Sequence, residues 1–322
     1  MSKMDKTNES TGKARRIGIL PIKDFAVLSY AALAEPLRAA NFLAGHTLYD
    51  IVNIGIGSDA VQSSGAATIQ TQAKVGDDVK LDALFVVAGG DLTEFEDRAT
   101  MTWLARLARA GVQLGGVSGG PVILARAGLM EGRRMTLHWE YAEALSEISP
   151  HLLVERTLYV IDRDRVTCAG GTAPMDLTHA LISRHHGSDF ARRVSDWFMH
   201  TDVRPAVGPQ RSGLVERVGC NVPAILDAVE AMENHLSDKL SLSQLAAFSA
   251  QSPRQLTRLF REKLNLSPME YYRQLRLDKA QNLLRNSALS LTEIALATGF
   301  ANSSHFSRSY TAHYGAPPST YR

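Results

Sequence analysis

Short apolar runs alternate with helical segments between residues 15 and 200. The apolar runs lack the polar alternation of a half-exposed strand, so they predict strands buried on both faces of a parallel sheet. A hairpin about Asp162–Arg165 and two helices near 175–185 and 189–199 complete the region. The pattern predicts a doubly wound α/β domain over residues 16–200. Its other predicted strands are 15–21, 49–56, 83–90 and 112–117, and its other predicted helices are 28–45 and 101–111.

The alternation of apolar runs and helical segments stops between His200 and Asn221. TDVRPAVGPQRSGLVERVG contains two prolines and three glycines and has no helical stripe, a composition that predicts a linker, here placed at 201–220. A helix is expected from Pro223 to Leu236. The remainder predicts an all-α domain over 221–322, in which a long helix turns an apolar side inward through Leu277, Ala280, Leu283 and Leu284.

Two similar units make up most of this second region. The unit from Ser290 opens with the S-x-x-E spacing of a capping box, and Gly299 provides a turn before a second helix near Asn302. Two short helices joined by such a turn form a helix-turn-helix. The unit from Ser241 repeats it after a one-residue slip in the turn, so we expect two paired units. The aligned positions are Leu256, Arg258, Phe260 and Pro268 with Phe306, Arg308, Tyr310 and Pro318.

Residues 221–322 resemble the AraC family of transcription regulators. That family ends in A-x-x-x-G-F, then F-x-R-x-F/Y, then G-x-x-P-x-x-Y-R. The corresponding residues here are Ala295, Gly299, Phe300, Phe306, Arg308, Tyr310, Gly315, Pro318, Tyr321 and Arg322.

The resemblance implies that DNA is contacted by outward residues of the second helix in each unit. Arginine pairs with guanine, glutamine with adenine, and serine with a base or a phosphate, so the serines make the second unit the weaker base reader. Arg258 has two alternatives to a base contact, a phosphate contact or a pair with Glu262. The implied DNA-binding residues are Arg254, Gln255 and Arg258 in the first unit, and Ser303, Ser304, His305 and Arg308 in the second.

The charge distribution supports this assignment. The net charge is only +2, yet residues 252–322 contain ten Lys or Arg and four Asp or Glu, a surplus of six. A basic region that coincides with two helix-turn-helix units is expected to attract phosphates.

The first region contains a possible nucleophile turn. Gly116, Ser118 and Gly120 satisfy G-x-S-x-G, the strand-to-helix elbow that exposes a serine. Taken alone, the motif predicts a serine hydrolase or amidase with an accessory DNA-binding tail. The later acids and histidines that could complete its triad are Asp162, Asp164 or Asp176 and His179, His185 or His186, and His138 is the one candidate base that can be placed near the elbow.

The wider region resembles the class I glutamine-amidotransferase-like superfamily, in the PfpI-related branch found fused to AraC-type tails. The matching segments are AEPLRAAN, AGG, GVSGG with LARAGL, LHWE, and CAGGTAP with DL. In enzymes of that superfamily the elbow residue is cysteine, and Ser118 occupies its position here. Ser29 occupies a position that is acidic in some active members. Because a hydroxyl is a far weaker nucleophile than a thiolate, this departure favours a binding site over an enzyme.

We therefore expect a ligand pocket at the elbow, where a helix N-terminus would hold a carboxylate. The expected effector is a nitrogenous metabolite, because relatives with this architecture respond to betaines, carnitine derivatives or arginine. An aromatic surface from Phe25, Tyr30, Phe42 and Trp139 would receive a quaternary ammonium. For His138 and Trp139, core packing is the alternative to a binding role. The predicted ligand-binding residues are Glu35, Gly89, Gly90, Ser118, Gly119, His138, Trp139 and Thr172.

The complete hypothesis is a ligand-responsive transcription activator, not an enzyme, that acts as a homodimer on paired operator half-sites, with RNA polymerase as a further partner. A purely architectural DNA protein is a third alternative, but it would need no sensor domain.

Composition also bears on compartment and cofactors. The two cysteines, Cys168 and Cys220, have neither metal nor redox spacing, which fits a reducing compartment. No apolar run approaches a membrane span, and residues 1–15 are polar, predicting a disordered tail rather than a signal peptide. We expect a cytoplasmic, nucleoid-associated protein with no cofactor, no metal and no membrane partner.

Overall fold

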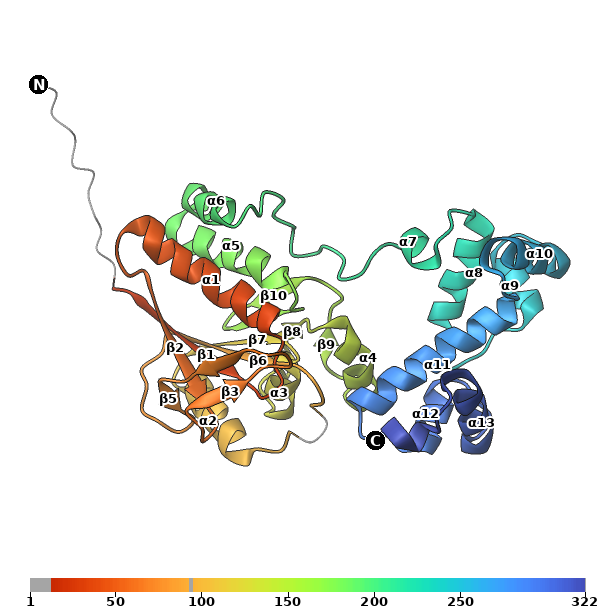
Figure 1. Cartoon of the computed structure of the whole chain (residues 1–322), viewed down its shortest axis with the longest axis horizontal. Helices are drawn as coiled ribbons and strands as arrows, with labels where there is room; N and C mark the ends of the chain where they lie inside the picture. The colour runs from red at the N-terminus through yellow and green to blue at the C-terminus, as the bar shows by residue number, and fades with distance from the viewer. Residues whose placement is uncertain (1–12, 93–94, 322) are drawn as a thin grey trace, which may run out of the picture. The chain divides into compact units, whose positions relative to one another are not determined.

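The computed structural model describes residues 13–92 and 95–321 (Figure 1). These residues form two compact units. The first comprises the described residues up to Trp139 together with His151–Gly208, and the second comprises Glu140–Pro150 and the described residues from Pro209 onward. The predicted tail, 1–15, lies outside the described residues up to residue 12, and Arg15 begins the first strand.

A seven-stranded sheet forms the centre of the first unit. Its strand order is β10-β11-β7-β6-β1-β2-β5, and only the β10–β11 pair is antiparallel. The predicted hairpin is that pair, with Arg163 at a φ of +57° in its turn. The strands are β1 (Arg15–Pro21), β2 (Tyr49–Gly55), β5 (Ala73–Lys74), β6 (Ala83–Ala88), β7 (Gln113–Ser118), β10 (Tyr159–Asp162) and β11 (Arg165–Cys168).

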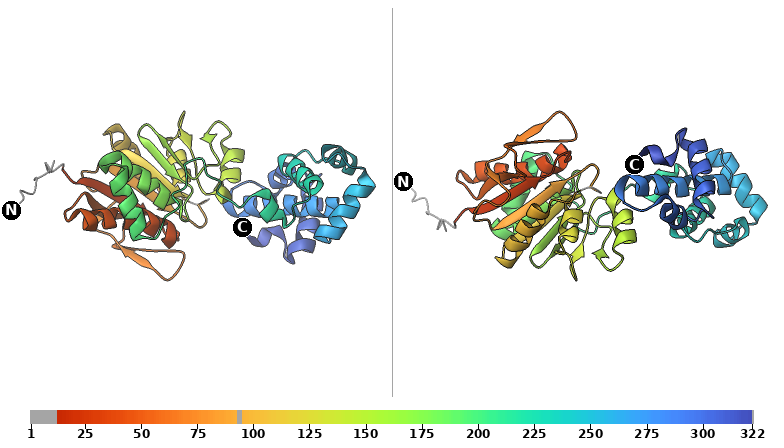
Figure 2. Two further views of the ribbon diagram at one scale, coloured as in Figure 1. Left: turned by 90° about the horizontal axis from the view of Figure 1, so that it is seen from above. Right: turned by 90° about the horizontal axis from the view of Figure 1, so that it is seen from below.

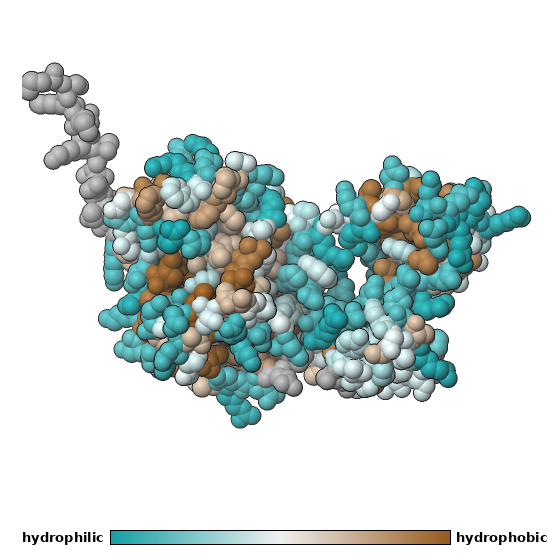
Figure 3. Space-filling model, viewed as in Figure 1, coloured by the Kyte–Doolittle hydropathy of each residue, from teal (hydrophilic) through white to brown (hydrophobic). Residues whose placement is uncertain are grey.

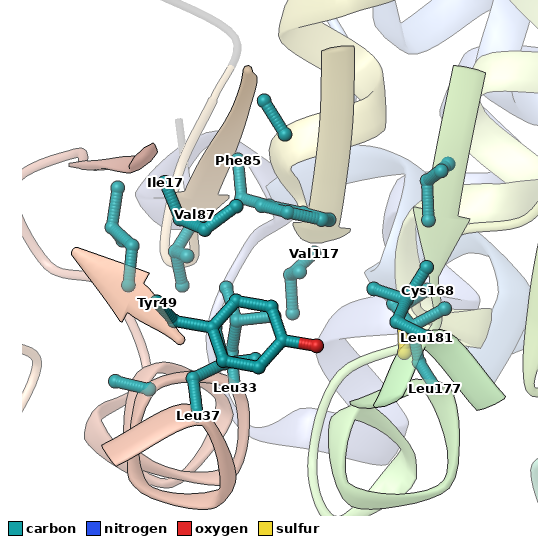
Figure 4. Packing of buried hydrophobic residues seen from close by; sticks show 14 of the residues in the cluster. Ile17, Leu33, Leu37, Tyr49, Phe85, Val87, Val117, Cys168, Leu177 and Leu181 are labelled. Carbon is teal, nitrogen blue, oxygen red and sulfur yellow. The ribbon is translucent and has the colours of Figure 1, made fainter. Parts of the chain in front are cut away.

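Helices cover both faces of this sheet, as the doubly wound prediction requires. Figures 1 and 2 show α1, α5 and α6 on one face and α2 and α3 on the other. On the first face, Leu33 of α1 and Leu177 of α5 pack against Phe85 and Val117 of the strands (Figure 4). The helices are α1 (Val27–Ala44), α2 (Arg98–Arg109), α3 (Gly120–Arg126), α5 (Ala173–His186) and α6 (Ser188–Trp197).

Two small ribbons lie outside the main sheet and were not predicted. One pairs β3 (Ala60–Gln62) with β4 (Thr68–Gln70), and the other pairs β8 (Arg134–Met135) with β9 (Leu153–Val154). Their strands are only two or three residues long, too short for a hydrophobic pattern to reveal.

The second unit is entirely helical. Its helices are α4 (Trp139–Ile148), of which Glu140 onward belongs to this unit, α7 (Leu214–Val218), α8 (Pro223–Asn234), α9 (Leu242–Phe248), α10 (Pro253–Leu264), α11 (Pro268–Asn286), α12 (Leu291–Ala297), α13 (Ser303–Tyr314) and the 3-10 turn η1 (Pro318–Tyr321). Helix α7 lies within the stretch predicted as a linker.

Two hydrophobic clusters hold this unit together. The first surrounds α8, α9, α10 and the beginning of α11, and the second surrounds α12, α13 and the later part of α11. The long helix thus contributes to both clusters, and its four predicted apolar residues are all buried, each at most 3% exposed. Hydrophilic side chains dominate the visible face of each unit in Figure 3, with apolar patches between them.

Helix α4 is an unpredicted part of the second unit. Ala144 is buried in the cluster around α12 and α13. Glu147 forms an ion pair with Lys279 at 3.2 Å, and the carbonyl of Glu140 accepts a hydrogen bond of 2.7 Å from Asn282. These contacts bind α4 to α11 by packing, charge and a hydrogen bond together.

Candidate ligand site and DNA-binding surface

Ser118 occupies a strained turn between β7 and α3. Its φ is +60°, in the left-handed region that a non-glycine residue adopts only at a cost, on the order of 1–3 kcal/mol. The side chain is buried. The strand-to-helix elbow expected from G-x-S-x-G is therefore present, with serine as the elbow residue.

Three segments distant in sequence meet around this serine. Gly170, in the loop between β11 and α5, lies so close that an added Cβ would fall 2.6 Å from the Cβ of Ser118. The amide of Gly171 donates to Oγ of Ser29, at 2.8 Å, and the amide of His138 donates to the carbonyl of Ser118, at 3.1 Å. We call the group Ser29, Ser118, His138, Gly170 and Gly171 the elbow site.

The elbow offers few free donors. The N–H of Gly119 already donates a hydrogen bond to the carbonyl oxygen of Ala88, at 3.0 Å, and Pro121 has no N–H. In an acyl-transfer enzyme, a donor next to the nucleophile would stabilise the developing oxyanion. Here the amide that follows Ser118 is already bonded. Helix α3 is only seven residues long, so the expectation that its N-terminus holds a carboxylate loses its main support.

The acids and histidines considered as triad members have partners elsewhere. His179 Nδ1 lies 2.8 Å from Oγ of Ser195, and His185 Nδ1 lies 3.0 Å from the hydroxyl of Tyr49. A proton acceptor must lie within hydrogen-bond reach of the group it activates. The others pair as follows: His186 contacts the ring of Phe190 edge to face, Asp176 binds Arg204 and His200, Asp162 binds Arg163, and Asp164 binds Arg133 and Arg165.

Cys168 does not replace the missing thiolate. It lies in β11, two residues before Gly170, and is completely buried. Burial raises the pKa of its thiol to about 12, so the side chain stays protonated near neutral pH and is a poor nucleophile.

The second helices of the two helix-turn-helix units have matching exposure. In α10, Leu256 and Phe260 are buried while Arg254 and Arg258 are exposed; in α13 the aligned Phe306 and Tyr310 are buried. The predicted slip also appears, because the four residues 249–252 between α9 and α10 correspond to the five residues 298–302 between α12 and α13. Ser304, His305 and Arg308 are exposed on α13, and Ser303 is half-buried.

Two predicted DNA contacts already have partners within the unit. Arg258 donates to Glu262 at 2.9 Å, the pair anticipated as an alternative. Gln255 Oε1 accepts from the amide of Ser252, at 3.2 Å, and from its hydroxyl, at 2.8 Å. Gln255 therefore caps α10, and to bind adenine through both ends of its amide it would have to give up that cap.

Comparisons with known proteins agree with both units. A model of the DJ-1/PfpI family matches residues 15–184, and a helix-turn-helix domain model matches 245–322. The HTH-type transcriptional regulator GlxA of Rhizobium meliloti (strain 1021) is 43% identical over 309 residues, covering 96% of this chain and 95% of that protein. The HTH-type transcriptional regulator GbdR of Pseudomonas aeruginosa is 36% identical over 302 residues, 94% and 82% of the two chains. This chain is an AraC-type transcriptional regulator with a DJ-1/PfpI domain.

A solved structure supports the same assignment. The crystal structure of an AraC family transcriptional regulator from Pseudomonas putida has 25% identity and a TM-score of 0.52, covering 57% of this chain and 99% of that one. This AraC-type regulator is thus a DNA-binding protein. Within its described residues, no helix is long and apolar enough to cross a membrane, and no group of three His, Cys, Asp or Glu could hold a metal ion.

The regulator does not bring all the predicted ligand residues together. Glu35 lies six residues beyond Ser29 on α1, about 9 Å along the helix, and pairs with Arg38 at 2.6 Å. Gly89 and Gly90 pack against the backbone and side chain of residues 24–26. Thr172 accepts a hydrogen bond from Arg204, at 2.9 Å. Of the predicted set, Ser118 and His138 belong to the elbow site, Gly119, Trp139 and Thr172 adjoin it in the chain, and Gly89 follows Ala88, whose carbonyl accepts from Gly119.

The four aromatic residues expected to receive an ammonium group do not form one surface, which corrects that expectation: the rings of Phe25 and Tyr30 pack 5.7 Å apart, but Phe42 lies away from them. Phe25 is fully buried, and Phe42 lies twelve residues beyond Tyr30 on α1, about 18 Å along the helix, where its ring packs at a tilt against Trp197. Trp139 is 40% exposed and lies 5.3 Å from the ring of His138.

Sequence reasoning missed Gly170, Gly171, and the pair formed by Asp176 and Arg204. The glycines and Asp176 all lie in the segment CAGGTAP-x-DL, which carries the family resemblance. That motif indicates that the segment matters, but it does not indicate which residues these three contact. Arg204 lay in the predicted linker, where an isolated arginine gives no sign of a buried partner.

Proposed function

We propose that this AraC-type regulator senses a small nitrogenous metabolite at the elbow site, and that occupancy of the site controls binding of operator DNA by the second unit. The observation that carries the proposal is the φ of +60° at Ser118. Such strain persists where the surroundings fix the backbone, and it is frequent at ligand-binding and catalytic positions. A serine with no function at this turn could be replaced by glycine, which adopts that φ without strain.

The site binds its ligand without reacting with it. A serine nucleophile needs an adjacent base and a prepared set of oxyanion donors. The adjacent amide of Gly119 is already bonded to Ala88, and the histidines His179 and His185 are bonded to Ser195 and Tyr49. A sensor needs neither a base nor an oxyanion site, so the retained turn with serine in place of cysteine fits sensing better than hydrolysis.

The effector class follows from the groups around the elbow. The hydroxyls of Ser29, Ser118 and Thr172 can bond to a carboxylate or a hydroxyl of the ligand. Trp139, beside the ring of His138 and partly exposed, offers an aromatic face to a cationic nitrogen. A betaine, a carnitine derivative or an amino acid combines these features.

The two second helices, α10 and α13, support binding to paired DNA half-sites. We propose that a homodimer binds paired half-sites in the cytoplasm, at the nucleoid, and acts there on RNA polymerase. The first unit provides the ligand-dependent dimer, and α10 and α13 contact DNA.

A thermal-shift screen of the full-length protein tests the ligand half of the proposal. A ligand that binds only the native state raises the unfolding temperature by mass action. We expect a rise with at least one of glycine betaine, carnitine and arginine at millimolar concentration. His138→Ala should weaken that ligand at least tenfold, whereas His151→Ala, an exposed histidine paired with Glu131, should leave its affinity unchanged.

Two results would count against the proposal. If His138→Ala and His151→Ala bind the ligand equally, the ligand site is not at the elbow. If a serine-directed acylating reagent labels Ser118 at neutral pH and the adduct turns over, the hydrolase alternative is the better one.

A further inference from the structure

Arg204 makes the densest set of polar contacts near the elbow site, although it lies on an irregular segment. Its backbone amide donates to Oδ1 of Asp176, at 2.9 Å, and its Nε and Nη2 donate to Oδ2, at 3.0 and 2.6 Å. Nη2 also donates to Oγ1 of Thr172, at 2.9 Å. His200 contacts Oδ1 of the same carboxylate, at 2.8 Å.

The carboxylate of Asp176 needs these partners. Its side chain is completely buried in the first turn of α5. A buried carboxylate is costly without compensation, and removal of one partner of such a pair is strongly destabilising. The Arg204 guanidinium donates twice to one oxygen, Oδ2, and the Arg204 backbone amide donates to the other, Oδ1, so both carboxylate oxygens are bound by the same residue. The segment that contains Arg204 is therefore held in one position.

The same short loop contacts Ser118 at one end and Arg204 at the other. Gly170 touches Ser118, and the next residue, Gly171, is bonded to Ser29. Thr172, the residue after that, is bonded to Arg204. A ligand that displaces Gly170 or Gly171 would therefore move Thr172 and the start of α5, because the three residues are consecutive.

Arg204 also lies where the chain leaves the first unit. The carbonyl of Ala206 accepts a hydrogen bond of 2.8 Å from the amide of Leu158, and Gly208 packs against the side chain of Leu158. Gly208 is the last residue of the first unit. Residues 200–208 are thus fixed by the contacts of His200 and Arg204 with Asp176 and by Leu158, and no helix or strand of their own restrains them.

We infer that Arg204 is a positioning residue that links the elbow site to the segment leading to the DNA-binding unit. A ligand at the elbow shifts the loop 170–172, which changes the contact of Thr172 and Asp176 with Arg204 and so frees or fixes residues 200–208. This inference rests on the proposed ligand-controlled function. The inference names Arg204 as the residue through which ligand binding at the elbow site would alter residues 200–208.

The test uses full-length protein and a DNA duplex selected from a random-sequence library by the wild-type regulator. Arg204→Ala should change the Kd for that duplex at least fivefold without added metabolite, because it removes the link that the ligand would act on. Hydrogen exchange of residues 200–208 should accelerate in the same variant. The matched control is Arg192→Ala, which removes an exposed arginine–aspartate pair with Asp189 on α6 and should change neither quantity.

A second variant distinguishes an effect on DNA affinity from a loss of folding. Arg204→Lys keeps a positive charge beside Asp176 but cannot make the paired hydrogen bonds or reach Thr172 in the same geometry. It should melt close to the wild-type temperature and still change the duplex Kd at least threefold. A purely structural role for Arg204 in the first unit would alter the melting temperature but not the Kd.

The outcomes are distinguishable. If Arg204→Lys folds and both its Kd and its exchange over 200–208 equal those of wild type, the inference about Arg204 is wrong while the proposed function stands. If the wild-type protein enriches no DNA sequence, the proposed function fails and the inference fails with it.

Discussion

Arg258 illustrates how one side chain can have a role in the free protein and another in the complex. In the structure it pairs with Glu262, one turn along α10, with both side chains largely exposed. Exposed pairs of this kind contribute only about 0–1 kcal/mol, so DNA can displace Glu262 at little cost. The position of Arg258 on the exposed face of a recognition helix is therefore compatible with a base contact.

Substitution of Arg258 should reveal that contact. Arg258→Ala should weaken operator binding by roughly 1–3 kcal/mol and relax the preference at one base pair. Glu262→Ala, which removes the partner but not the arginine, should bind at least as tightly as wild type. Binding assays over single-base operator variants and several salt concentrations measure both effects. Equal weakening on all sequences with a smaller salt slope would identify a phosphate contact instead.

Ser118 and Gln255 differ in how far the sequence predicted their roles. G-x-S-x-G predicted the turn at Ser118, because a strand-to-helix elbow depends on local backbone sterics. The S-x-x-Q spacing of a capping box is present at Ser252 and Gln255, as it is at Ser241 and Gln244. The resemblance to a DNA-binding family predicts a base reader at Gln255, whereas its local spacing predicts the helix cap that the structure contains.

At the scale of elements, the two helix-turn-helix units have different residues at the left-handed position of the same turn. After α12 the chain turns through Gly299, at a φ of +69°, and after α9 it turns through Ala250, at +51°. A Cβ added to Gly299 would fall 2.6 Å from the carbonyl oxygen of Leu236 and 2.8 Å from that of Ser237. Glycine is thus required at the second turn by space as well as by φ, whereas the first turn accepts alanine under strain.

Reciprocal substitutions at these turns should have opposite effects. Gly299→Ala should destabilise α12 and α13 by about 2 kcal/mol or more, because both the backbone and the contact with residues 236–237 must shift. Ala250→Gly should stabilise α9 and α10 by up to about 1 kcal/mol through relief of the left-handed strain. Hydrogen exchange of amides in α9 and α12 reports each turn separately. Similar protection of α12 in Gly299→Ala and wild type would contradict the steric argument.

The elements that the sequence predicted are those with a strong periodic or local signal. The strand from Arg15 to Pro21 and the buried side of α11 follow from apolar patterning, and the capping box at Ser290 follows from its spacing. Contacts between distant residues have no such signal. Asp176 and Arg204 are 28 residues apart, and nothing in either neighbourhood indicates the pair. The separation of Tyr30 from Phe42, by contrast, follows from their twelve-residue spacing on one predicted helix.

At the scale of the whole molecule, ligand and DNA must affect each other equally. If an effector changes the affinity for operator by some factor, linkage requires that operator change the affinity for effector by the same factor. We expect roughly a 5- to 150-fold change, the usual range for such coupling. Titration of the effector into full-length protein with and without operator measures it. An effector affinity that is the same in both titrations would mean that the first unit does not control DNA binding.

The contacts of α4 bear on how such regulators can be taken apart or recombined. Glu140–Pro150 lies within the stretch that matches the DJ-1/PfpI family, yet it packs with the helices of the second unit. A fragment that begins at Pro209 would leave the hydrophobic cluster around α12 and α13 without Ala144, and Lys279 and Asn282 without their partners. Grafting this DNA-binding half onto a foreign sensor would expose the same gap. The boundary suited to protein engineering therefore does not coincide with any single cut in the chain.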